Sequence, residues 1–258
     1  MKKEKTAGRK SRRKLWLLIA AALFLIVLIG TESSLLTLRG AERTVDAYRE
    51  MFPNAEITVL NDGSVELKPG SGTEAKSTGF IFYVGAQILP EAYIPLLARL
   101  TEAGYFCSIP KLPFQMANLK PDAAAAVMEA HPEMENWYVG GHSMGGLTVA
   151  GFAADNADKV KGIVLLAAYP MRDLSAFKLP VLSIYGDRDG VLNKKRYEAF
   201  LAEAPAELEE HILPGGNHAQ FGDYGLQPHD NEAAISDEEQ QAATAELLLD
   251  WLQRHENV

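Results

Sequence analysis

A serine between closely spaced glycines is the first residue of this sequence that could do chemistry. Gly141-His142-Ser143-Met144-Gly145 fits the pattern G-x-S-x-G, and an apolar run precedes it while a segment rich in small apolar residues follows it. This chemistry requires a strand, a tight turn and a helix, because the turn lifts the serine hydroxyl above the sheet. The pattern therefore predicts Ser143 as a nucleophile for acyl transfer. His142, adjacent to the serine, is interpreted as a packing residue of this turn.

A nucleophilic serine needs a base and an acid, and after a turn of this kind they follow in the order Ser, Asp or Glu, His. Gly186-Asp-Arg-Asp-Gly190 comes directly after the apolar run Val181–Tyr185. Asp189 is the preferred acid and Asp187 the reserve. A short aspartate-rich turn without chemistry is the competing interpretation.

The predicted base is His218, which lies in Pro214-Gly-Gly-Asn-His218 after a further strand. A glycine turn ahead of it would let the imidazole reach between Ser143 and Asp189, take the serine proton and pass it to the leaving group. A metal site made of His218, Asp223, His229 and Asp230 is a weaker alternative, because these residues lack the spacing of known zinc motifs. No cofactor is expected.

Two backbone amides should stabilise the oxyanion that forms during such a reaction. The amide of Met144 would lie at a helix N-terminus, where the helix dipole favours negative charge. The second donor should come from Gly85-Ala86-Gln87, after the apolar run Phe80–Val84. Ala86 is preferred, and Gln87 is possible. Four aromatic residues near these segments could line an acyl pocket or belong to the core: Phe114, Tyr169, Phe221 and Tyr224.

The elements that must position these residues alternate in type. Apolar runs bounded by glycine or proline predict buried strands, and segments of helical spacing separate them. Expected strands cover 80–84, 105–109, 137–140, 162–168, 181–185 and 208–213, and expected helices cover 90–103, 121–130, 145–154, 194–204 and 237–255. Asn61-Asp-Gly-Ser64 predicts a hairpin turn between Ile57–Leu60 and Val65–Lys68. This order predicts an α/β fold with a mostly parallel sheet, helices on both faces and no large lid.

The N-terminus departs from this pattern. Residues 1–14 contain eight Lys or Arg and only Glu4 as an acid, and residues 15–30 are apolar without interruption. As a helix this run would span roughly 24 Å, slightly short of a hydrocarbon core of about 30 Å. We expect a basic cytoplasmic tail (1–14), a transmembrane anchor (15–31), a linker with a helix (32–54) and a hydrolase domain (55–258) outside the membrane. A cleaved signal peptide, which would release the domain, is the alternative.

The overall charge limits the classes of partner. The whole chain has a net charge of −9 despite its basic tail, so the remainder is strongly acidic and unsuited to nucleic acid. With Cys107 as the only cysteine, the chain can form neither an intramolecular disulfide nor a cysteine-based zinc site.

Four segments together resemble the small lidless α/β hydrolases of bacteria, often described as related to dienelactone hydrolase. They are Tyr83–Ala86 with Ala92-Tyr93, Gly140–Gly146, Tyr185–Gly190 and Gly216–Gly225. The resemblance covers roughly residues 55–255 and implies Ser143, Asp189 and His218 as a triad acting on small ester-type substrates. The sequence departs from dienelactone hydrolases proper, which use a cysteine nucleophile, so dienelactone is not expected as substrate. Thioester or amide cleavage, acyl transfer, and a membrane-tethered binding protein on a hydrolase fold remain alternatives.

Overall fold

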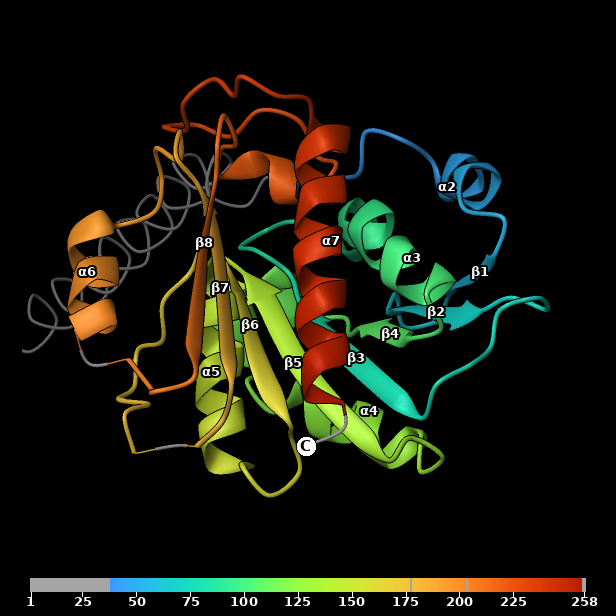
Figure 1. Cartoon of the computed structure of the whole chain (residues 1–258). Coiled ribbons are helices and arrows are strands. Elements are labelled where there is room, and N and C mark those ends of the chain that lie inside the picture. The colour runs from blue at the N-terminus through green and yellow to red at the C-terminus, as the bar shows by residue number, and fades with distance from the viewer. Residues whose placement is uncertain (1–37, 177, 203, 257–258) are drawn as a thin grey trace, which may run out of the picture. The chain divides into compact units, whose positions relative to one another are not determined.

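The apolar runs of the sequence form the central strands of one eight-stranded sheet (Figure 1). The computed structural model describes residues 38–176, 178–202 and 204–256. The spatial order of the strands is β1-β2-β4-β3-β5-β6-β7-β8. Their bounds are β1 Ala55–Val59, β2 Val65–Pro69, β3 Thr78–Tyr83, β4 Phe106–Ile109, β5 Asn136–His142, β6 Gly162–Leu166, β7 Val181–Gly186 and β8 Leu208–Leu213.

The sheet is parallel from β4 to β8, and its other edge is antiparallel. β1 and β2 form the predicted hairpin, and β2 pairs antiparallel with β4. Every residue of β3, β4 and β6 is buried, as expected for parallel strands covered on both faces. The edge strand β8 instead carries Glu209 and Glu210, and such charges discourage further strand pairing. The predicted α/β class with a mostly parallel sheet is confirmed.

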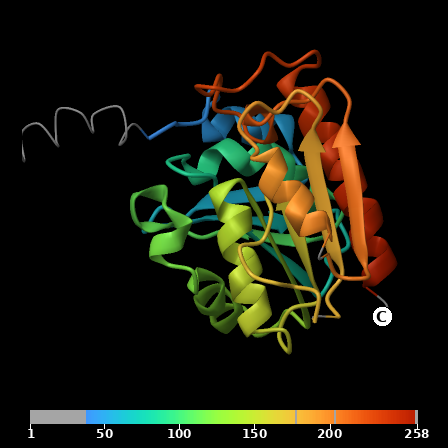
Figure 2. The ribbon, with the colours of Figure 1, turned by 90° about the vertical axis from the view of Figure 1, so that its left-hand side faces the viewer.

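Helices cover both faces of this sheet. The α-helices of the described residues are α2 Val45–Met51, α3 Ile94–Glu102, α4 Ala123–Ala130, α5 Met144–Asp155, α6 Lys194–Ala202 and α7 Asp237–His255. α3 and α7 pack together on one face, and α4 and α5 lie on the other (Figures 1 and 2). α6 lies beside β7, where the hydroxyls of Tyr197 and Ser183 are hydrogen-bonded at 2.8 Å.

The ends of the helices follow from local chemistry. α7 begins with a capping box in which the Ser236 side chain accepts from the Glu239 amide while the Glu239 carboxylate accepts from the Ser236 amide. Its first turn is acidic and its last turn basic, as the helix dipole favours. The helix expected over 90–103 is instead a 3-10 turn, η1 (Pro90–Tyr93), followed by α3. Pro95 falls in the first turn of α3, where its missing amide costs no hydrogen bond.

The chain from Leu38 onward belongs to the folded body, which differs from the linker expected over 32–54. Arg39 forms a β-bridge with Ile88, and the buried Tyr48 hydroxyl donates to Asp223. Arg43 pairs with the same carboxylate at 2.9 Å. A linker interpretation missed the contacts of Tyr48 and Arg43 because Asp223 lies more than 170 residues later in the chain.

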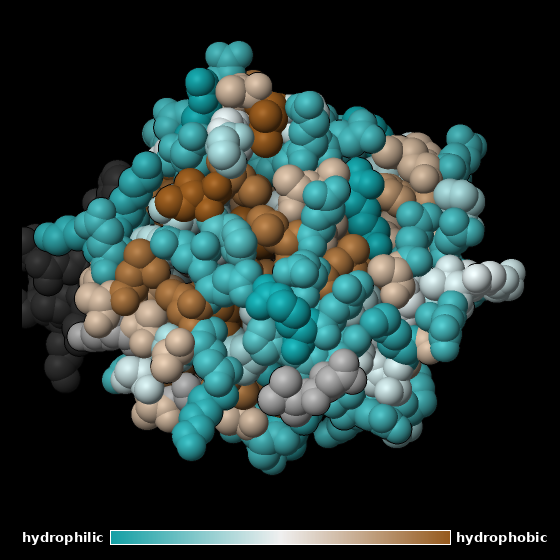
Figure 3. All heavy atoms as spheres, in the orientation of Figure 1, coloured by the Kyte–Doolittle hydropathy of each residue, from teal (hydrophilic) through white to brown (hydrophobic). Residues whose placement is uncertain are grey.

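The expected tail and anchor, residues 1–14 and 15–31, lie outside the described residues. Within the described part of the chain, no helix is long and apolar enough to cross a membrane. The face that carries α7 is mostly hydrophilic, with small hydrophobic patches between the polar groups (Figure 3), which is ordinary for a folded domain.

The parallel strands all end at one edge of the sheet, and this edge collects the predicted functional segments. The connections after β3, β5, β7 and β8 contain Ala86, Ser143, Asp189 and His218, respectively. In open α/β sheets this carboxyl edge is where ligands bind. The topology therefore brings the predicted site residues to a common edge.

Candidate active site

Ser143 occupies a strained turn between β5 and α5. Its φ is 52° and its ψ is −121°, a conformation that residues with a side chain rarely adopt. The Ser143 amide donates to the Leu166 carbonyl at the end of β6, at 2.9 Å. Such strain persists only where the surroundings enforce it, so the turn is built to present this side chain.

The glycines around Ser143 leave no space for side chains. A Cβ on Gly145 would lie 2.1 Å from the Tyr83 carbonyl oxygen, and one on Gly141 would lie 2.5 Å from the Gly145 carbonyl carbon. A Cβ on Gly146 would lie 2.5 Å from the Ala168 side chain. The glycine spacing that identified the motif is therefore a steric requirement for the helix to pass this close to β3 and β6.

His218 and Asp189 form a buried hydrogen-bonded pair. Nδ1 of His218 lies 2.8 Å from Oδ2 of Asp189, and the two side chains are 1% and 0% exposed. The other carboxylate oxygen accepts from the amides of Val191 and Leu192, at 2.8 and 2.7 Å. Because a carboxylate only accepts hydrogen bonds, the His218 proton lies on Nδ1 and Nε2 is left as a base. Nε2 is buried and has no partner among the described residues.

Asp187, the reserve acid, takes a different position. Its Oδ1 accepts from the Gly215 amide at 2.8 Å. It thereby fixes the turn after β8, where Gly215 has a φ of 77°. The geometry thus places Asp189 against the imidazole and Asp187 in the support of the loop that carries it.

His142 brings the histidine loop next to the serine turn. It directly precedes Ser143, and the centroid of its ring lies 4.6 Å from that of His218. Its Nδ1 lies 2.8 Å from the Tyr93 hydroxyl, which also accepts from the Gly85 amide at 3.0 Å. The Tyr93 hydroxyl therefore joins the Gly85 amide to the ring of His142. Burial, with the nearby imidazole of His218 as a second cause, holds the pKa of His142 well below its usual range, so this ring stays neutral.

The prediction that His142 only packs in the serine turn is thus incomplete, because its ring also joins three segments. Through Tyr93 it connects the loop after β3, the serine turn and the histidine loop. Sequence reasoning missed Tyr93 as a site residue, since 49 positions separate it from His142. Its one signal was its place in the resemblance to small bacterial hydrolases.

The two expected oxyanion donors have amides suited to the task. Met144 is the first residue of α5, so its amide has no acceptor within the helix. Ala86 lies between Gly85, which donates to Tyr93, and Gln87, which donates to the Gln115 carbonyl at 2.9 Å. Within the described residues the Ala86 amide has no acceptor. Gln87, the other possible donor, has its amide already engaged.

The polar residues considered for a metal site instead hold the histidine loop in place. Asp230 accepts from the Ala219 amide at 2.8 Å, and Asp223 is bound by Tyr48 and Arg43. Over the described ranges there is no group of three His, Cys, Asp or Glu side chains arranged for a metal ion. Cys107 is buried in β4, and burial raises the pKa of its thiol to about 12. This thiol is not a nucleophile.

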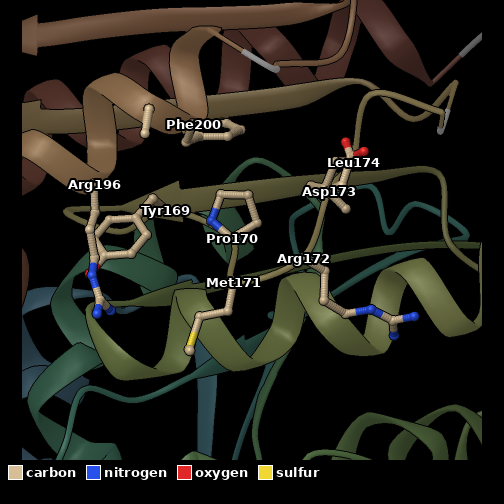
Figure 4. Close-up of a pocket in the computed structure, with 9 residues that line it drawn as sticks. Tyr169, Pro170, Met171, Arg172, Asp173, Leu174, Arg196 and Phe200 are labelled. Atoms are coloured by element: carbon tan, nitrogen blue, oxygen red, sulfur yellow. The ribbon is translucent and has the colours of Figure 1, made fainter.

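The four aromatic residues considered for an acyl pocket separate into three environments. Phe221 and Tyr224 are buried around His142, with ring centroids 5.6 and 6.4 Å from it. Phe114 is 71% exposed and has a φ of 53°. Tyr169 lines a pocket, a hollow of about 390 Å³ between the segment after β6 and α6 (Figure 4). The pocket is lined by Tyr169, Pro170, Met171, Arg172, Asp173, Leu174, Arg196, Ala199 and Phe200.

Residues 79–242, more than half of the chain, match the model of a protein family described as the alpha/beta hydrolase family. The chain belongs to this family. The predicted family is therefore confirmed for the α/β hydrolases as a whole, whereas the narrower likeness to dienelactone hydrolase-type enzymes stays a prediction. No curated protein matches the sequence.

Solved structures of other α/β hydrolases share the fold at low identity. Est1E from Butyrivibrio proteoclasticus is 16% identical, with a TM-score of 0.56 over 80% of this chain and 100% of that one. The esterase domain of a Rhodothermus marinus protein is 15% identical, with a TM-score of 0.58 over 78% and 98%. A membrane phospholipase A described as a bacterial virulence factor is 16% identical, with a TM-score of 0.59 over 96% and 100%.

Proposed function

We propose that this α/β hydrolase cleaves carboxylic esters through an acyl-enzyme, with Ser143, His218 and Asp189 as its triad. The observation that carries the proposal is the buried His218–Asp189 pair, which leaves Nε2 as a base beside the strained serine turn. Esterases among the structures with this fold are consistent with that chemistry.

The proposed reaction has two halves. In the first, Nε2 of His218 takes the Ser143 proton while Oγ attacks the ester carbonyl, and the imidazolium then protonates the departing alcohol. In the second, water attacks the acyl-enzyme by the same route and releases the acid. The Asp189 carboxylate holds the tautomer and stabilises the imidazolium. The amides of Met144 and Ala86 would receive the developing oxyanion.

The Ser143→Ala variant tests the assignment. We expect it to fold normally and to lose the hydrolysis of p-nitrophenyl esters by at least about 10³-fold, because no hydroxyl remains to be acylated. The measurement is nitrophenol release, with circular dichroism as a check on folding. The Ser175→Ala variant, which changes a serine on an exposed turn after β6, serves as the control. Unchanged turnover in Ser143→Ala would refute the triad.

We also propose that residues 15–31 anchor the hydrolase domain at the outer face of a membrane. This rests on the basic residues before the apolar run and on the positive-inside rule. We expect intact protein in the membrane fraction of the native host, resistant to extraction by salt and alkali, and degraded by protease added to spheroplasts. A soluble form shortened at the N-terminus would instead indicate cleavage and secretion.

A further inference from the structure

Each wall of the pocket between the segment after β6 and α6 follows, along the chain, a segment that belongs to or contacts the candidate active site. One wall begins at Tyr169, three residues beyond Leu166, whose carbonyl accepts from the Ser143 amide. The other wall is α6, which begins five residues after Asp189. The strand beside the serine turn and the loop that carries the proposed acid thus lead along the chain to the two pocket walls, at the carboxyl edge of the sheet. Ser143, Asp189 and His218 are not among the residues that line the pocket.

The pocket has an apolar wall and a basic rim. Tyr169, Pro170, Leu174 and Phe200 supply the apolar part, and Arg172 and Arg196 supply the charges (Figure 4). Its volume of about 390 Å³ suits one arm of a small ligand. The combination fits a short apolar chain that ends in a polar or charged group.

The charges within the pocket are not equally available. Arg172 is paired with Asp155 at 2.6 Å, and Asp173 accepts from the Ser175 amide at 2.8 Å. The Arg196 guanidinium has no hydrogen-bond or ion-pair partner among the described residues. Arg196 is therefore the positive charge in this pocket that is left to bind a ligand, whereas the Asp173 carboxylate, which an amide hydrogen bond does not neutralise, is a negative charge in the same pocket.

The surroundings of Arg196 add to its positive potential. Lys194 and Lys195 share its turn, and that first turn of α6 contains no acidic residue. First turns of helices usually favour acidic side chains, because the helix dipole is positive there. The chain as a whole is acidic, with a net charge of −9, and repels anions elsewhere. These three positive side chains in the first turn of α6 thus favour an anionic group at the Arg196 end of the pocket.

We infer that this pocket binds an anionic group of the substrate through Arg196, so that the preferred esters carry a carboxylate or phosphate at the end of a short apolar arm. The inference rests on the proposed esterase function and adds a substrate class to it. An arginine fork pairs with either anion through two parallel hydrogen bonds.

The test uses the full-length protein in detergent and matched esters. One set comprises p-nitrophenyl suberate, its neutral methyl ester and the corresponding phosphonate, which differ only at the far end of the acyl chain. A second pair, phenyl octanoates with a para-carboxylate or a para-carboxamide, places the charge on the alcohol side. The variants are Arg196→Gln, Arg196→Lys and the control Lys195→Gln, which removes the same charge from the same turn at a residue that does not line the pocket.

In one of the two groups of esters, we expect the wild type to have a lower KM for the anionic ester than for its neutral counterpart. Arg196→Gln should raise that KM about tenfold, as loss of a charged hydrogen-bonding partner typically does, and leave the neutral ester within about twofold. Arg196→Lys should recover part of the loss, and Lys195→Gln should change the ratio little. Equal KM values for charged and neutral esters in the wild type, or equal effects of Arg196→Gln and Lys195→Gln, would overturn the inference.

A binding measurement separates this inference from the proposed function. Suberate, which contains no ester, should bind the wild type in a calorimetric titration and bind Arg196→Gln about tenfold more weakly. If no ester is hydrolysed but suberate binds in this way, the esterase proposal fails and the anion site stands. If esters are hydrolysed while suberate binds both proteins equally or neither of them, the anion site is wrong.

Discussion

At the scale of single residues, the candidate site depends on hydrogen bonds that fix the orientation of its side chains. Both oxygens of Asp189 are engaged, one with His218 and the other with two backbone amides. A carboxylate held in this way cannot rotate away from the imidazole. The same principle applies to Tyr93, whose hydroxyl satisfies Gly85 on one side and His142 on the other.

This arrangement predicts a specific effect of Tyr93→Phe. The change would leave the Gly85 amide and Nδ1 of His142 buried without partners, at a cost of about 1–3 kcal/mol each. Because Ala86 follows Gly85 directly, we expect the oxyanion donor to lose its alignment, with kcat lowered about tenfold or more and KM little changed. Steady-state kinetics on a neutral p-nitrophenyl ester measures this split.

Tyr197→Phe is the matched control for Tyr93→Phe. It also removes a buried tyrosine hydroxyl, which bonds to Ser183 between β7 and α6, away from the serine turn. We expect a lower melting temperature with kcat unchanged. Equal kinetic effects of the two variants would mean that Tyr93 acts through general stability and does not position the oxyanion loop.

Sequence reasoning reached some of these residues and not others. Ser143 and His218 stand in glycine-rich contexts that indicate a role. Asp189 was preferred to Asp187, but the sequence alone could not decide between them, because both follow the same strand and their different partners are set by the turn after β8. The Tyr93–His142 contact was invisible, because two buried polar groups far apart in the chain leave no pattern in either segment. From the sequence, Arg196 is predicted only to lie in a helix. Its place in a pocket depends on the segment after β6, which the structure places next to α6.

At the scale of elements, apolar periodicity predicted the strands well, because the central strands are buried on both faces and form continuous apolar runs. The apolar pattern was less informative where a feature other than burial sets the boundary of a helix. Pro95 divides the helix expected over 90–103, and the short 3-10 turns η2 (Pro113–Gln115), η3 (Ala117–Leu119) and η4 (Ala219–Phe221) carry no repeating pattern. The helix α2 was placed in a linker because its burial depends on a remote loop.

The junction between β5 and α5 gives a prediction at this scale. In Gly145→Ala, the new Cβ would lie 2.1 Å from the Tyr83 carbonyl oxygen, which belongs to the backbone at the end of β3 and cannot move easily. We expect a loss of more than about 2 kcal/mol in the free energy of unfolding, since overpacking of this kind displaces backbone. Ester hydrolysis should fall with it, because the serine turn must shift.

Gly151→Ala in the same helix is the control. Its new Cβ would approach only the Arg172 side chain, at 3.8 Å. Alanine is favoured over glycine within a helix by about 1 kcal/mol, so this variant should be as stable as the wild type or more so. Denaturant titration of both variants gives the comparison. A Gly145→Ala protein as stable and active as Gly151→Ala would contradict the account of the serine turn.

At the scale of the whole molecule, one sheet edge gathers the proposed nucleophile, acid and base and the candidate oxyanion donors from four separate connections. The histidine loop is held from several sides. Asp223 accepts from Tyr48 in α2, and the Gln240 side chain in α7 accepts from the Asn217 amide and donates to its carbonyl. Elements remote in sequence thus fix the place of His218, which explains why the chain from Leu38 onward belongs to the body.

The central claim is that His218 makes Ser143 reactive, and covalent labelling tests it most directly. A fluorophosphonate should modify the wild type at Ser143, identified by mass spectrometry of the labelled peptide. The His218→Ala variant should react at least about 10²-fold more slowly, because the base that accepts the serine proton is gone. Labelling at another residue, or an equal rate in His218→Ala, would contradict the claim.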